Sequence, residues 1–356
     1  MNRRVQSVDA LRGLIMIVMA LDHVRDFFHS AAQSFQPDDL ARTTAAIFFT
    51  RWITHFCAPV FMFTAGLGAY FLLHSGRTKA QVSRFLVTRG WWLMFLDVTA
   101  VRFAMTLGAG PLIINVLWGL GCAMIVLAAL IYLPIPVVGA LSVAVIALHN
   151  AADSISLPGI HQLGVFEIHG VTVILSYTLI PWFAVMAAGF AFGGTFTQHK
   201  RWIAPMGLSL TLAFLLLRTI NVYGDPTPWT HGLLSFLRVN KYPPSLDFLL
   251  MTLGPALMIL AWFDKMQFAP RNPLIVFGRV PLFYFLGHLF VAHALVILLA
   301  RSWSANPILR QAPPGYGYGL GGVYLIWVAV VATMYPACLW FGGVKQRRRD
   351  WRLSYL

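Results

Sequence analysis

The residues with the greatest capacity for chemistry lie near the start of the chain, in the segment DALRGLIMIVMALDHVRDFF. This stretch is apolar enough for a membrane helix, yet it carries five charged side chains and a histidine. Ionisable residues at membrane depth are costly, so by default they indicate a functional site. His23 lies between Asp22 and Asp26, and carboxylates beside an imidazole favour its protonation and orient its ring. His23 is therefore a candidate general base.

Helical spacing gathers most of these residues on one side of the first helix. At about 100° per residue, one stripe holds Asp9, Arg12, Met16, Met19, His23 and Asp26. Arg12 and His23 are separated by about 16 Å along the axis, which predicts Arg12 near the cytoplasmic face and His23 toward the outer half. Arg25 is expected to point more than a quarter-turn away from His23. A purely structural interpretation stays open, with Asp9 and Arg12 as an interfacial pair and residues 22–26 in the headgroup layer.

Two later helices carry further polar groups. Arg51 and His55 are four residues apart and share a helical face, and Pro59 leaves the carbonyl of His55 without its usual partner and predicts a kink. Tyr284 and His288 share a face of another apolar segment. Each of these groups could instead be structural, through an arginine that reaches the membrane interface or histidines that form hydrogen bonds between helices.

The composition indicates which elements must hold these residues. The chain has 356 residues, of which 58% are hydrophobic and 11% charged, and its mean hydropathy is +0.72. An average soluble domain carries about 25% charged residues, so we expect an all-α, polytopic membrane helical bundle in one domain over residues 1–356. About ten spans are predicted from the length that a helix needs to cross the bilayer. They lie near 9–28, 51–73, 84–106, 111–131, 133–151, 174–196, 203–222, 246–264, 273–300 and 320–343.

The net charge of +14 is explained by basic residues in loops on the cytoplasmic side rather than by nucleic-acid binding. With both termini placed in the cytoplasm, the inner loops and tail are more basic than the outer loops, which predicts a multi-pass membrane protein with both termini inside. The inner basic residues include Arg3, Arg4, Arg77, Lys79, Arg84, Lys200, Arg201, Lys265, Arg271, Lys345, Arg347, Arg348, Arg349 and Arg352. The expected outer loops, 29–50, 152–173, 223–245 and 301–319, are longer and carry Pro, Gly, Asp, His and Trp.

The sequence resembles a bacterial membrane family, long described as a domain of unknown function, that is related to the catalytic domain of heparan-α-glucosaminide N-acetyltransferase. The resemblance spans nearly the whole chain. Its motifs are SVDALRGLIMIVMALDHVRDFF, FFTRWITHFCAPVFMFTAG, NVYGDPTPW, KYPPSLDFLLMTLGPAL, GRVPLFYFLGHL and YPACLWFGGVKQRRRDWRLSYL. The spacing of Arg12 and His23 is also similar to an Arg-and-His signature of the wider transmembrane acyltransferase superfamily.

The resemblance implies transfer of an acetyl group from cytosolic acetyl-CoA to an extracytoplasmic sugar or other envelope acceptor, by an O- or N-acetyltransferase with no tightly bound cofactor. The lysosomal relative has its catalytic histidine after the first helix of the domain, which corresponds by order to His29. The catalytic candidates are therefore His23, Asp22, His29 and His55, and the sequence does not choose between the three histidines. The substrate-binding candidates are Arg12, Asp26, Arg51, Tyr284 and His288.

Arg12 and the basic residues of the inner loops could hold the phosphates of the acyl-CoA donor. The other expected partners are membrane lipids and a second copy of the chain in a homodimer, and no nucleic acid. No metal site is expected, because Cys57, Cys122 and Cys338 lie in apolar segments without a metal-ligand pattern. The alternative function is a transporter or channel for a small polar or ionic solute, with the charged stripe lining its path; haem ligation by histidine pairs is a weaker alternative.

Overall fold

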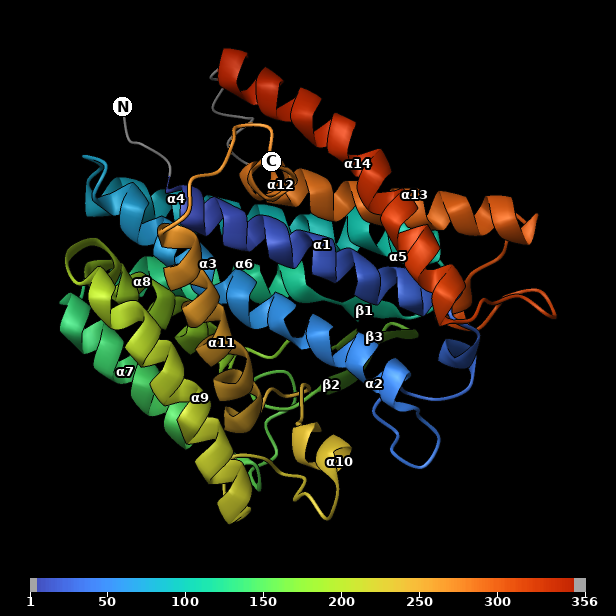
Figure 1. Cartoon of the computed structure of the whole chain (residues 1–356), viewed down its shortest axis with the longest axis horizontal. Helices are drawn as coiled ribbons and strands as arrows, with labels where there is room; N and C mark the ends of the chain where they lie inside the picture. The colour runs from blue at the N-terminus through green and yellow to red at the C-terminus, as the bar shows by residue number, and fades with distance from the viewer. Residues whose placement is uncertain (1–4, 349–356) are drawn as a thin grey trace. The chain divides into compact units, whose positions relative to one another are not determined.

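The computed structural model describes residues 5–348, which are mostly helical with one small sheet. Arg3, Arg4, Arg349 and Arg352, which contribute to the predicted orientation, lie outside the described residues. The chain forms two compact units (Figure 1). Unit 1 contains Ala58–Val98 and Pro111–Met266, and unit 2 contains Val5–Cys57, Thr99–Gly110 and the chain from Gln267 onward. A single domain over residues 1–356 stays a prediction.

Within residues 5–348, six helical stretches are long and apolar enough to cross a bilayer. They are Ala45–Leu73, Ile135–Ala152, Lys200–Ile220, Leu246–Asp264, Pro281–Ala300 and Leu320–Arg348. Only 17% of the apolar part of Ile135–Ala152 is buried inside the protein, so most of its apolar side chains need lipid to remove them from water. The helical membrane architecture is thus supported, whereas the number of about ten spans and the cytoplasmic position of both termini stay predictions.

Unit 2 is built around its first helix, α1. Its elements are α1 (Gln6–Phe28), η1 (Ser30–Gln33), α2 (Ala45–Trp52), η2 (Ile53–Phe56), α5 (Arg102–Thr106), α12 (Pro273–Arg279), α13 (Pro281–Ala300), η6 (Pro307–Leu309) and α14 (Leu320–Arg348). Helices α12, α13 and α14 all pack against α1 (Figure 1). The indole Nε1 of Trp327 on α14 donates to the carbonyl of Ile17 at 2.8 Å. The charged residues of α1 are therefore surrounded largely by protein of their own unit.

Glycines allow the backbones of α1 and α12 to touch. A Cβ atom on Gly13 would lie 1.8 Å from the carbonyl oxygen of Leu274, and one on Gly278 would lie 1.8 Å from that of Asp9. Small residues at helix crossings give membrane helices this close approach. The position of α1, and with it the position of its polar side chains, is therefore fixed by backbone contact.

Unit 1 holds the remaining helices and the sheet. Its elements are α3 (Cys57–Leu73, from Ala58), α4 (Lys79–Leu96), α6 (Val116–Leu130), α7 (Ile135–Leu148), η4 (His149–Ala152), α8 (Trp182–Gln198), η5 (Lys200–Trp202), α9 (Ile203–Ile220), α10 (Leu233–Leu237), α11 (Leu246–Asp264), β1 (Leu112–Ile114), β2 (Gly164–Ile168) and β3 (Val171–Leu175). Helices α4 and α6 pack together, as do α7 and α8, and α9 and α11.

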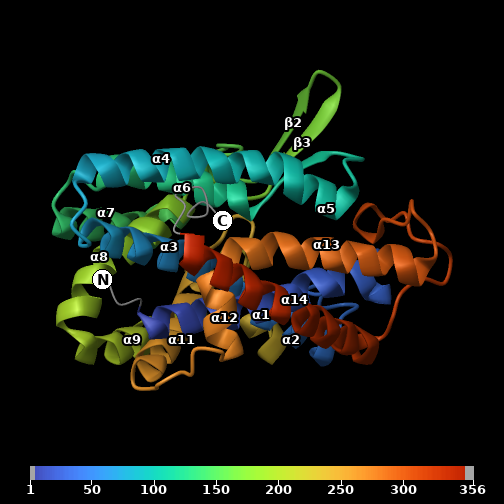
Figure 2. The same ribbon diagram turned by 90° about the horizontal axis from the view of Figure 1, so that it is seen from above.

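The sheet is a departure from the all-helical prediction. Strands β2 and β3 pair antiparallel, while β1 pairs parallel with β3. Both strands of the hairpin are rich in β-branched residues, and His169 and Gly170 between them have positive φ angles, as two-residue hairpin turns require. The hairpin projects from the helices of unit 1 (Figure 2). It occupies an expected outer loop and the start of the span expected at 174–196.

Several expected spans are interrupted, two of them beside a proline. The stretch Ala45–Leu73 changes to a 3₁₀ turn at Ile53–Phe56, just before Pro59, and the predicted kink there stays a prediction. The span expected at 84–106 contains a π-helical segment, Asp97–Val101. The span expected at 273–300 divides at Val280, because Pro281 begins the next helix.

Candidate functional site

All nine predicted site residues belong to unit 2, and the first group that the structure assembles joins α1 to α13. Nδ1 of His23 lies 2.7 Å from Nε2 of His288, and the two rings are nearly parallel, at 21°, with centroids 5.0 Å apart. Nδ1 of His288 lies 2.9 Å from the carbonyl oxygen of Tyr284, one turn earlier on α13. His288 and Tyr284 are fully buried, whereas His23 is partly exposed. The partly exposed His23 is therefore held in position by a hydrogen bond to the buried His288.

The second group is a cluster of charges between α1 and α2. Asp22 accepts from Nη1 of Arg51 through both carboxylate oxygens, at 2.6 and 2.5 Å. Nη2 of Arg25 donates to Asp22 at 3.0 Å and to Asp26 at 2.6 Å. Two arginines and two aspartates cancel in formal charge, so this charge cluster (Asp22, Arg25, Asp26 and Arg51) can persist in a largely buried position. It fixes the helical turn that carries His23.

Arg25 is the member of the charge cluster that sequence reasoning missed. Its side chain is 3% exposed and bonds two carboxylates. The helical wheel predicts that it points away from His23, and the groups that it binds are Asp22 at i−3 and Asp26. The i,i+3 spacing of opposite charges was the signal that could have identified it.

His29 follows the last residue of α1, where the chain becomes extended. The backbone of this segment pairs with a glycine-tyrosine segment before α14: Tyr318 donates to the carbonyl of Phe28 at 2.8 Å, and Ser30 donates to the carbonyl of Tyr318 at 3.1 Å. Gly317, at φ 125°, is required there because a Cβ atom would lie 2.7 Å from Ser30. The repeated glycines and tyrosines of residues 315–319 were a second signal that the sequence interpretation did not use.

The environment of His29 favours its neutral form. The side chain is buried, and burial lowers the pKa of His29 below its ordinary value, with the positive charge of Arg25 as a second cause. Burial also raises the pKa of Tyr316, whose hydroxyl donates to the carbonyl of Phe27 at 3.2 Å. The exit of α1 is thus a packed environment in which a neutral His29 is favoured.

Arg12 and His55 occupy other parts of unit 2. Arg12 lies near the start of α1, with Nη1 3.9 Å from the carboxylate of Asp9, and the length of α1 keeps it about 16 Å from His23. His55 is buried in η2, one turn beyond Arg51. The structure therefore gathers His23, His288 and Tyr284 in one group and Asp22, Asp26 and Arg51 in another.

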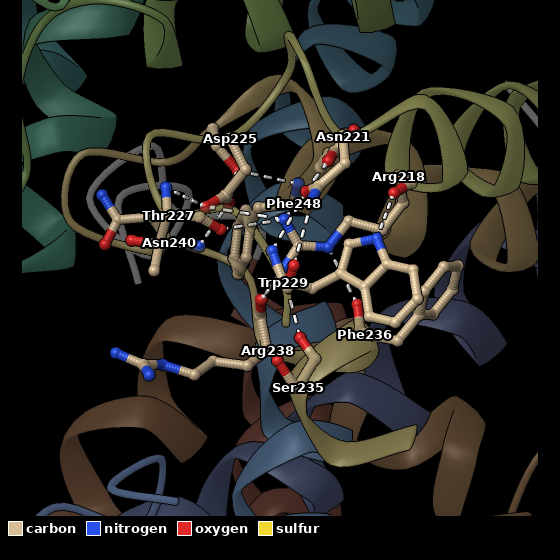
Figure 3. A network of polar contacts seen from close by, with 12 residues as sticks. Arg218, Asn221, Asp225, Thr227, Trp229, Ser235, Phe236, Arg238, Asn240 and Phe248 are labelled. Atoms are coloured by element: carbon tan, nitrogen blue, oxygen red, sulfur yellow. Dashed lines mark hydrogen bonds and ion pairs between the residues drawn. The ribbon is translucent and has the colours of Figure 1, made fainter. Parts of the chain in front are cut away.

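Unit 1 contains a separate polar network that organises the segment between α9 and α11 (Figure 3). Arg218 is 2% exposed and donates to four backbone carbonyls of this segment, those of Thr227, Ser235, Phe236 and Arg238. Its Nη1 also lies 3.9 Å from Asp225 and 3.8 Å from Asp247. Asp225 in turn accepts from the backbone of Asn240 and the hydroxyl of Ser245. The motifs NVYGDPTPW and KYPPSLDF are thus joined by one buried arginine.

No gathering of three histidine, cysteine, aspartate or glutamate side chains suited to a metal ion occurs among residues 5–348. The polar groups present are instead those of acid–base chemistry. They are a partly exposed imidazole with a buried partner, and carboxylates held by arginines.

Two comparisons with known proteins bear on the family of the chain. A search of curated proteins returned no match to the chain. The sequence profile of the family described as heparan-alpha-glucosaminide N-acetyltransferase, catalytic, matches residues 4–227, more than half of the chain. The matched region includes α1, the charge cluster, His29 and His55. The chain therefore belongs to the family of the heparan-alpha-glucosaminide N-acetyltransferase catalytic domain.

Proposed function

We propose that this protein is an acetyltransferase of the inner (plasma) membrane that moves an acetyl group from acetyl-CoA to an amino or hydroxyl group of a sugar or other envelope component. The observation that carries the proposal is the family match over residues 4–227. The apolar helices, which need lipid to cover them, support a membrane location.

His23 is the proposed general base. Its ring is partly exposed, and it is positioned by a hydrogen-bonded partner, His288. The nucleophilic nitrogen or oxygen of the acceptor attacks the thioester carbon of acetyl-CoA and gives its proton to His23. The carbon–sulfur bond then breaks, and the CoA thiolate takes that proton from the imidazolium. The products are the acetylated acceptor and CoA with a free thiol, and His23 returns to its neutral form.

The charge cluster is proposed to support this step. Asp22 and Asp26 flank His23 in sequence, and a nearby carboxylate stabilises an imidazolium. Arg25 and Arg51 hold these carboxylates in place. The electric field of the carboxylates therefore acts from fixed positions, which is the condition for electrostatic stabilisation in an active site. Arg12, 22% exposed near the start of α1, is proposed to contact the phosphates of the donor, as a cation that phosphate oxygens can bind. His29 and His55 are the other candidates for the base.

The test uses the purified full-length chain with acetyl-CoA and an α-glucosaminide as the first acceptor probe, followed by peptidoglycan fragments and lipid head groups. Release of free CoA thiol that depends on an acceptor is expected. His23→Ala should lower the rate by at least about 100-fold, whereas His231→Ala, at an exposed histidine of unit 1, should retain it.

Three outcomes would count against the proposal in different ways. Full activity of His23→Ala would remove His23 as the base and direct attention to His29 and His55. No acceptor-dependent thiol release with any probe would contradict the acetyltransferase. Uptake of a polar solute into liposomes without CoA would favour a transporter.

A further inference from the structure

His288 has a specific relation to its two neighbours through its two ring nitrogens. Nδ1 lies 2.9 Å from the carbonyl oxygen of Tyr284, and Nε2 lies 2.7 Å from Nδ1 of His23. The rings of His288 and His23 are inclined by only 21° with centroids 5.0 Å apart, so the two imidazoles meet edge to edge through their nitrogens. The ring of Tyr284 is also nearly parallel to that of His288, with centroids 5.4 Å apart. The orientation of His288 is therefore set at both nitrogens.

The carbonyl of Tyr284 determines where the hydrogen atoms lie. A carbonyl oxygen can only accept, so the nitrogen 2.9 Å from it must carry a hydrogen and donate. Complete burial disfavours a charged ring for His288, and a neutral imidazole has one N–H only. Its Nε2 is then an acceptor, and the hydrogen in the 2.7 Å contact belongs to Nδ1 of His23.

The opposite arrangement would place two acceptors against each other. If Nε2 of His288 donated to His23, the lone pair of its Nδ1 would face the carbonyl of Tyr284 inside a fully buried site. A buried polar group left without a hydrogen bond costs about 1–3 kcal/mol. This cost favours the first arrangement, in which Nε2 of His23 carries the lone pair.

We infer that His288 is a positioning residue that holds His23 in the tautomer with hydrogen on Nδ1 and with Nε2 as the proton acceptor. The inference rests on the proposed function, because only a basic His23 needs a defined tautomer. His288 acts through His23 and not by contact with substrate. When Nε2 of His23 takes a proton, the bond from Nδ1 to His288 becomes charge-assisted and stronger, which stabilises the imidazolium.

Two substitutions separate this role from simple packing. His288→Gln keeps both functions, since the amide oxygen can accept from His23 and the amide N–H can donate to Tyr284. His288→Leu fills a similar volume and removes both. With acetyl-CoA and the α-glucosaminide, kcat should fall about 100-fold in His288→Leu and no more than about fivefold in His288→Gln, with KM nearly unchanged in both.

The tautomer itself is measured by nitrogen-15 NMR of the full chain in lipid, with His23 assigned by comparison with His23→Ala. The wild type and His288→Gln should show a hydrogen on Nδ1 of His23, and His288→Leu should show a mixture of tautomers. A wild-type His23 with its hydrogen on Nε2 would overturn the inference even if neither variant folds. Equal rates for His288→Leu and the wild type would also overturn it.

The same experiments distinguish this failure from that of the proposed function. If His23→Ala is inactive while His288→Leu is fully active, only the positioning role is wrong. If His23→Ala is fully active, the proposed base is wrong and the positioning inference falls with it.

Discussion

Replacing Arg51 in the charge cluster should lower the stability of the protein. Arg51 donates to both oxygens of Asp22, and the two side chains are 16% and 13% exposed. Arg51→Gln removes one positive charge and leaves Asp22 and Asp26 with Arg25 as the cation between them. Removing one partner of a buried pair costs about 3–5 kcal/mol. Because Arg25 remains, we expect about 2–3 kcal/mol, which corresponds to a fall in Tm of about 3–4 °C for a chain of this length.

The assay is thermal unfolding in detergent, followed by tryptophan fluorescence, for Arg51→Gln, Asp22→Asn and the double variant. The double variant makes the charge cluster neutral again, so the two losses of stability should not add. The double-mutant cycle should give a coupling energy above about 1 kcal/mol. Lys200→Gln is the matched control, since Lys200 is 51% exposed in its pair with Asp264 and such pairs contribute about 0–1 kcal/mol. Equal losses for Arg51→Gln and Lys200→Gln, or additive losses in the cycle, would refute the reasoning.

Three further predictions concern other parts of the chain. Gly278→Ala should destabilise the protein by about 3 kcal/mol, because the new methyl group meets a backbone carbonyl of α1. Gly321→Ala, with nothing within 4 Å, should leave the elution profile in gel filtration unchanged. Arg218→Met should cost about 3–5 kcal/mol and make the loop after α9 sensitive to protease, because buried carbonyls and carboxylates lose their donor; the exposed Arg201→Met should not. Burial lowers the pKa of His29 below its ordinary 6.5, so the unfolded chain binds its proton more readily and stability falls as pH drops below about 6.5. Tm measured from pH 7.5 to 5.5 should therefore fall less in His29→Gln than in the wild type, and equal slopes would contradict this.

Much of the helical architecture follows from the sequence, because long apolar segments with few charges have few other stable forms. Helices α9, α11 and α14 begin within three residues of the starts predicted for them. Within residues 5–348, length and composition support six of the ten expected spans, because α6 has only 15 residues, α8 only 17, and α1 and α4 carry several charges. The β2–β3 hairpin was not predicted, because its two strands have only five residues each and the apolar residues of β3 continue into the span expected at 174–196.

The site was predictable residue by residue but not pair by pair. Helical spacing identifies His23 and His288 as unusual, yet 265 positions separate them, and no local pattern joins two residues on different helices. Part of the charge cluster could be predicted from the sequence, because Asp22 and Arg25 are three residues apart on one helix. The contribution of Arg51 depends on how α2 packs, which is decided by tertiary contacts that propensity and periodicity do not encode.

The proposed reaction moves an acetyl group from acetyl-CoA to an acceptor on the other side of the membrane, with His23 as the base. The most direct test reconstitutes the full-length chain in sealed vesicles, with radiolabelled acetyl-CoA outside only and the α-glucosaminide acceptor inside only. Labelled N-acetyl product should accumulate inside with the wild-type protein and remain at background with His23→Ala. No labelled product with the wild type, or equal product with the two proteins, would contradict the account.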